Sequence, residues 1–133
     1  FDRKHWRRGN GTVVIEPTDD GEAILSIKSG DDLEIHFAQG PLMMPAEQSD
    51  LPEPRILSYY RTGIGRNGAD PATMVDTPAI VAGDFGPGRV LLFSPHPEKT
   101  NGLENLIQRG IEWQTGASSE RELTPESTLP TVR

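Results

Sequence analysis

One stretch of this chain decides its fold, residues 88–98, which read Gly88-Arg89-Val90-Leu91-Leu92-Phe93-Ser94-Pro95-His96-Pro97-Glu98. Its first half is an apolar strand that stops abruptly, and its second half presents a histidine and a carboxylate just past the strand's end. An imidazole, with an ordinary pKa of roughly 6.5, can accept a proton at neutral pH, and a nearby carboxylate can fix its tautomer and stabilise its cation. The stretch therefore predicts a catalytic base, His96, and the group that orients it, Glu98.

The residues on either side of this stretch predict a hairpin before it and a helix after it. A second apolar run, residues 77–85, is joined to residues 89–93 by the turn Gly86-Pro87-Gly88, and two such runs around a glycine-rich turn are typical of a β-hairpin. After Glu98 we expect Asn101 to cap a helix and Gly116 to end it. The apolar residues of this helix recur at near-helical spacing and are Leu103, Leu106, Ile107, Ile111 and Trp113.

The preceding part of the chain predicts more strands. Residues 12–16, 33–37 and 55–61 are each expected to form one, with a turn at residues 19–21 and a surface loop over residues 45–54. Residues 22–27 are consistent either with a strand or with one helical turn. The sequence therefore predicts an α/β fold, rich in strands, with one clear C-terminal helix. Residues 1–116 are expected to form one unit, and residues 117–133, rich in Ser, Thr, Glu and Pro, a disordered tail.

Composition excludes several classes of function. The formal net charge of -7 argues against a nucleic-acid partner, because phosphate backbones are bound through clustered Lys and Arg. No apolar stretch approaches the roughly 18 residues needed to cross a bilayer, so we expect a soluble chain without a membrane partner. With no cysteine, the chain has no disulfide or thiolate metal site, and the compartment stays open, with the cytoplasm slightly favoured. The chain begins at Phe1 rather than Met, and we expect it to be a piece of a longer protein.

The three histidines do not predict a metal site. No two of His5, His36 and His96 share the spacing of metal ligands, so we assign neither a metal nor a cofactor. His36 occupies a polar position of an alternating strand and His5 lies in a charged run, and neither is assigned a function.

Several of these motifs together resemble one known family. Ser94-Pro95-His96-Pro97-Glu98 followed by a helix resembles the His-Pro-Glu element of class I glutamine amidotransferase-like domains. More closely, residues 3–113 resemble the C-terminal half of the biotin-protein-ligase N-terminal-like (BPL_N) group of that superfamily. Strand, Gly-Pro-Gly turn, strand, His-Pro-Glu and helix in that order are more specific than His-Pro-Glu alone. The other matching pieces are His5-Trp6-Arg7-Arg8-Gly9, Gln39-Gly40-Pro41, Thr77-Pro78-Ala79-Ile80-Val81 and Gly86-Pro87-Gly88-Arg89-Val90.

The resemblance implies a flavodoxin-like α/β domain that hydrolyses an amide through a Cys-His-Glu triad. In such domains a cysteine on a tight strand-to-helix elbow attacks the amide, a histidine shuttles the proton and a glutamate orients the histidine. The resemblance assigns the histidine role to His96 and the glutamate role to Glu98. The cysteine and the preceding parallel strands would lie outside this chain, in the rest of the parent domain, and this chain alone would lack the nucleophile.

Two alternatives to this interpretation stay open. Ser94 lies two residues before His96 and would point to the same face of an extended strand, but nothing in the sequence places an oxyanion hole beside it. The second alternative is a catalytically silent domain of the same fold that binds a small molecule or a protein.

Overall fold

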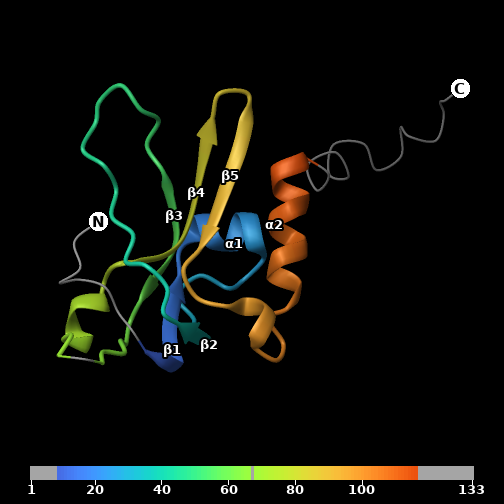
Figure 1. Cartoon of the computed structure of the whole chain (residues 1–133). Coiled ribbons are helices and arrows are strands. Elements are labelled where there is room, and N and C mark those ends of the chain that lie inside the picture. The colour runs from blue at the N-terminus through green and yellow to red at the C-terminus, as the bar shows by residue number, and fades with distance from the viewer. Residues whose placement is uncertain (1–8, 67, 117–133) are drawn as a thin grey trace, which may run out of the picture.

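In the part of the chain that the structure describes, the fold is mixed α/β, and two α-helices cover one face of a curled, five-stranded antiparallel sheet (Figure 1). The computed structural model describes residues 9–66 and 68–116, and the order of strands in the sheet is β2-β1-β3-β4-β5. The predicted tail at residues 117–133 and the histidine at position 5 lie outside the described residues. The elements are β1 (Asn10–Pro17), α1 (Asp19–Leu25), β2 (Leu33–Ala38), β3 (Arg55–Tyr60), the 3-10 turn η2 (Pro71–Met74), β4 (Pro78–Phe85), β5 (Gly88–Phe93), the 3-10 turn η3 (Pro97–Lys99) and α2 (Asn105–Thr115).

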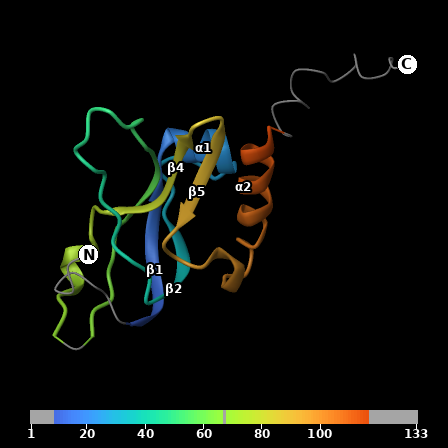
Figure 2. The same ribbon diagram turned by 45° about the horizontal axis from the view of Figure 1, so that its top comes forward.

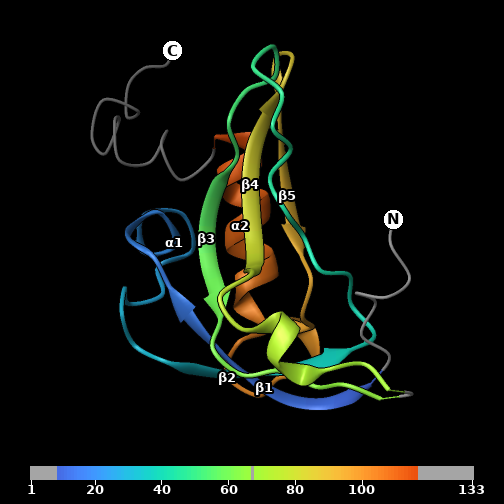
Figure 3. The same cartoon turned by 90° about the vertical axis from the view of Figure 1, so that its left-hand side faces the viewer.

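The predicted strands and hairpin are confirmed. The strands expected at residues 12–16, 33–37 and 55–61 correspond to β1, β2 and β3, and β4 pairs with β5 across the Gly86-Pro87 turn. Figure 3 shows the curl of the sheet: β1 and β2 run across the ends of β3, β4 and β5. The strand pairs of this sheet are all antiparallel.

Helix α1 corrects the prediction of a turn at residues 19–21 and of one clear helix in the chain. The chain becomes helical directly after Pro17 because Thr18 caps the helix, its Oγ1 accepting the Gly21 N–H at 3.2 Å. Three acidic side chains in the first turn match the positive end of the helix dipole. At the other end, Arg109 of α2 donates to the carbonyl oxygens of Leu25 at 2.8 Å and Ser26 at 3.1 Å. These contacts favour a helix where apolar periodicity alone left the choice open.

The C-terminal helix is confirmed, but it begins later than predicted. Asn101 does not cap it, because residues 101–102 form a turn in which Gly102 takes a positive φ, and α2 starts at Asn105. Gly116 ends the helix as expected, in the left-handed conformation with φ 78°. Leu106 is buried, whereas Ile107 and Ile111 are exposed, so the apolar face is narrower than the spacing suggested.

The alternation of side chains along the β4–β5 hairpin separates two environments. Ile80 is opposite Phe93, and the side chains of this pair face the helices. On the same side, Gly110 of α2 lies against Leu91 and Phe93. Val81 is opposite Leu92, one position along, and this row faces the opposite side of the sheet. There the long β2–β3 loop, residues 39–54, lies alongside the strands (Figure 2).

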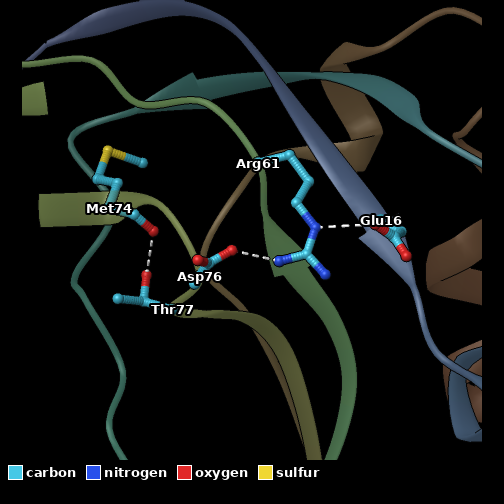
Figure 4. Close-up of polar contacts among 5 residues, drawn as sticks. All are labelled: Glu16, Arg61, Met74, Asp76 and Thr77. Carbon is cyan, nitrogen blue, oxygen red and sulfur yellow. Dashed lines mark hydrogen bonds and ion pairs between the residues drawn. The ribbon is translucent and has the colours of Figure 1, made fainter. Parts of the chain in front are cut away.

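An arginine at the end of β3 ties the segment before β4 to the rest of the sheet (Figure 4). The Arg61 guanidinium donates to Glu16 of β1 at 2.8 Å and to Asp76, while Thr77 Oγ1 donates to the Met74 carbonyl at 2.6 Å. The hydrogen bond to Glu16 is the main reason that the pKa of Arg61 lies above its ordinary value. All three charged side chains are partly exposed, so these ion pairs contribute little to the stability of the fold. Their main effect is to orient the segment that leads into β4.

A buried chain of hydrogen bonds joins the core to the segment after β5. The Tyr60 hydroxyl donates to Ser94 Oγ at 2.7 Å, and Ser94 Oγ donates to the Pro41 carbonyl at 2.8 Å. The Phe37 ring meets Tyr60 edge-on, and burial raises the pKa of Tyr60 above its ordinary value. Gly40 has no room for a Cβ, because Ser94 and Phe37 press against it. The loop after β2 is therefore fastened to the start of the His-Pro-Glu turn.

Substitution of Ser94, the central residue of this network, is expected to lower the free energy of unfolding more than substitution of Tyr60. Ser94→Ala leaves the buried Tyr60 hydroxyl without its acceptor and breaks both bonds, so we expect the free energy of unfolding to fall by about 2 kcal/mol. Tyr60→Phe removes one donor and leaves the bond to Pro41 in place, so we expect a loss of about 1 kcal/mol. Urea unfolding of the two variants measures both values, and an equal or reversed order would contradict this account.

Candidate active site

In the structure, His96 and Glu98, the two candidate residues from the sequence, lie in contact. His96 lies just after β5, and Pro97 begins the turn η3, in which Glu98 follows. His96 Nδ1 and Glu98 Oε1 are 2.8 Å apart and form a hydrogen bond. A carboxylate can only accept, so Nδ1 carries the proton and Nε2 is the basic nitrogen of the neutral ring. Nε2 lies 3.4 Å from the Ala38 carbonyl, which can accept a hydrogen bond from Nε2–H once the ring is charged.

The environment of Glu98 keeps its carboxylate ionised. Burial acts to raise the pKa of Glu98, but the hydrogen bond from His96, a backbone hydrogen bond and the charges of His96 and Lys99 outweigh it. The pKa of Glu98 is therefore lower than its ordinary value, and the hydrogen bond is lost only as the pH falls through this lowered pKa. Both side chains are partly open to solvent, His96 33% and Glu98 49% exposed, so a reactant can reach them.

A second histidine lies beside the pair. The rings of His36 and His96 are 6.1 Å apart between centroids, and the His96 N–H donates to the His36 carbonyl at 2.7 Å. Sequence reasoning gave His36 no role, because its alternating strand indicates only that it lies on a polar face. Nothing local in the sequence indicates which distant residue lies opposite His36.

The environment of Ser94 does not favour a nucleophilic role. Its side chain is buried, and its hydroxyl donates to the Pro41 carbonyl while it accepts from Tyr60. A nucleophilic hydroxyl must offer its proton to the base, whereas this proton is directed at a backbone oxygen. Ser94 therefore acts in this structure as an interior hydrogen-bonding residue.

An apolar groove of about 550 Å³ lies apart from the histidine and the glutamate. Its floor is the face of β3, β4 and β5 that points away from the helices, and its wall is the β2–β3 loop. Neither His96 nor Glu98 lines it. Asp84 is the one titratable residue in the lining, and the larger apolar side chains there include Met43, Met44, Leu51, Val81, Phe85 and Leu92.

Within residues 9–66 and 68–116, no three His, Asp or Glu side chains come together as a potential metal site. Over the same residues, neither helix has the length and apolar character required to span a membrane.

Comparison of the chain with protein-family models, with curated proteins and with solved structures found no significant match in any of the three. The function must therefore be inferred from the geometry of the site.

Replacement of His96 is expected to raise the pKa of Glu98. His96→Ala removes the hydrogen bond and the positive charge that lower this pKa, while the burial that raises it remains. The midpoint of an NMR pH titration of the Glu98 carboxyl carbon should therefore move to higher pH. His36→Ala is the matched control and should leave the midpoint in place, since His36 makes no hydrogen bond to the carboxylate. An unchanged midpoint in His96→Ala would show that the pair is not coupled in solution.

Proposed function

We propose that this chain supplies the histidine and the glutamate of a Cys-His-Glu triad in a class I glutamine amidotransferase-like domain. The cysteine would come from chain outside this sequence, together with the parallel strands of a flavodoxin-like sheet. The observation that carries the proposal is the 2.8 Å hydrogen bond from His96 Nδ1 to Glu98, which leaves Nε2 as the base. The order of β4, β5, the His-Pro-Glu turn and α2 supports it, since this is the order of elements in the family it resembles.

The proposed reaction uses each nitrogen of His96 for a different purpose. Nε2 takes the proton of the cysteine thiol, and the thiolate attacks the amide carbon of a glutamine side chain. Glu98 accepts from Nδ1–H throughout, which holds the ring and stabilises its positive charge. The protonated Nε2 then gives its proton to the departing nitrogen, which leaves as ammonia. Water hydrolyses the thioester, yielding glutamate and the free thiol.

The test is a glutaminase assay on the full-length parent protein. We expect an elbow cysteine after an apolar strand upstream of Phe1, and ammonia release that Cys→Ser and His96→Ala each reduce by about 10³-fold or more. Glu98→Gln should reduce it by roughly 10–10²-fold, since the base keeps its nitrogen but loses its charged partner. Glu34→Gln, which changes an exposed carboxylate on β2, is the matched control and should leave the rate unchanged. Absence of an upstream cysteine, or full activity in His96→Ala, would overturn the proposal.

The second candidate function is a catalytically silent domain that binds a small molecule, and the apolar groove favours it. A volume of about 550 Å³ is that of a small-ligand site, and the groove is complete without His96. Exposed apolar side chains of its lining, such as Phe85 and Leu92, offer contact to an apolar ligand.

A hydrophobic fluorescent probe tests this groove. Leu92→Glu places a charge in the groove, so we expect the affinity for 1-anilinonaphthalene-8-sulfonate to fall about tenfold. Ile111→Glu is the matched control, because Ile111 is similarly exposed, 54% against 51% for Leu92, but lies on α2, outside the groove. Fluorescence titrations in which both variants bind the probe equally would exclude the groove as its site.

A further inference from the structure

The turn that carries His96 is attached to the edge of the sheet by a threonine hydroxyl. Strand β2 is an edge strand, so the groups on its outer side have no strand partner in the sheet. At His36 both backbone groups are nevertheless paired. The His36 carbonyl accepts the His96 N–H at 2.7 Å, and the His36 N–H donates to Thr100 Oγ1 at 2.9 Å.

The hydroxyl of Thr100 closes this arrangement into a ring of hydrogen bonds. It accepts the His36 N–H and donates its own proton to the His96 carbonyl at 3.0 Å. In an ordinary antiparallel pair, the His36 N–H would donate directly to the His96 carbonyl. Here His36 and His96 form an isolated antiparallel bridge, and the Thr100 hydroxyl is hydrogen-bonded to both of these groups. Only a side chain that both donates and accepts can fill this place, and a hydroxyl does so while a methyl group of the same size does not.

We propose that Thr100 is a positioning residue, whose hydroxyl holds His96 at the place on β2 where the imidazole meets both Glu98 and the Ala38 carbonyl. Glu98 lies between the two attached residues, so a shift of either end of the turn changes the Nδ1–Oε1 distance. Ala38 is on β2 itself, two residues after His36, so the same attachment sets the position of Nε2. The catalytic meaning of this inference rests on the proposed function, but the attachment itself does not.

The experiment compares Thr100→Val with Thr100→Ser in the full-length protein. Valine has the shape of threonine without the hydroxyl, and serine keeps the hydroxyl. Thr62→Val is the matched control, because Thr62 Oγ1 accepts the Val14 N–H at the same 2.9 Å, on the neighbouring strand β1. Both threonine hydroxyls accept a hydrogen bond from the N–H of a strand residue, but only the Thr100 hydroxyl also bonds to His96.

Amide hydrogen exchange measures the attachment directly. In the unmodified protein the His36 amide should be protected. We expect the His36 amide to exchange about tenfold faster in Thr100→Val and at the unmodified rate in Thr100→Ser. Thr62→Val should accelerate only the Val14 amide. A His36 amide that exchanges freely in the unmodified protein would overturn the inference, whether or not the valine variant folds.

Two further measurements separate positioning from a merely structural role. In Thr100→Val the NMR midpoint of Glu98 should move to higher pH, as in His96→Ala, whereas Thr100→Ser and Thr62→Val should keep it. Turnover of glutamine should fall roughly tenfold in Thr100→Val with KM unchanged, since misplacement of a base by a fraction of an ångström slows the chemical step. An unchanged Glu98 midpoint together with unchanged turnover in Thr100→Val would overturn the inference. Loss of the proposed function, seen as no glutaminase activity in the unmodified protein, would leave the amide and Glu98 results standing.

Discussion

Three segments that are distant in the sequence meet at the buried hydroxyl of Ser94. It accepts from Tyr60 at the end of β3 and donates to the carbonyl of Pro41, in the loop after β2. Because Ser94 directly follows β5, these two bonds hold the chain at the point where it leaves the sheet, three residues before Pro97 begins its turn. The same loop continues into the wall of the apolar groove. One interior hydroxyl thus connects the segment that leads to His96 with the loop that forms the wall of the groove.

The pair and the groove lie in different places because the chain changes direction after β5. Within the strand, alternate residues face either the helices or the groove, as Leu91 and Leu92 do. Beyond Phe93 this alternation ends, and His96 pairs with His36 at the edge strand β2. Under the proposed function, an amide substrate would reach His96 at this edge, and the groove would contact something other than the reacting amide.

The sequence predicts most strongly what depends on neighbouring residues. The β4–β5 hairpin follows from two apolar runs around Gly86-Pro87-Gly88, and the contact of His96 with Glu98 follows from a two-residue spacing across a proline. Helix α1 is predicted only in part, as a turn at residues 19–21 and as either a strand or one helical turn at residues 22–27, because the cap at Thr18 and the arginine from α2 matter more there than apolar periodicity. The contact between His36 and Thr100 spans 64 positions, and no pattern in either segment indicates the other. The sequence therefore indicates the candidate residues His96 and Glu98, but not the long-range hydrogen bonds that hold their turn against β2.

The hydrogen bond between His96 and Glu98 cannot itself be what holds the turn in place. Both side chains are partly exposed, and a pair in such surroundings contributes little to stability. The residues around them are different: Ser94 and Pro95 are buried, and so is Pro97, which lies between the two. Burial of these neighbours and the backbone bonds to β2 fix the course of the chain, and this course places the side chains of His96 and Glu98. Under the proposed function, a base that is open to its substrate and yet held in one geometry requires this division, since the groups that react must face solvent while the groups that position them must not.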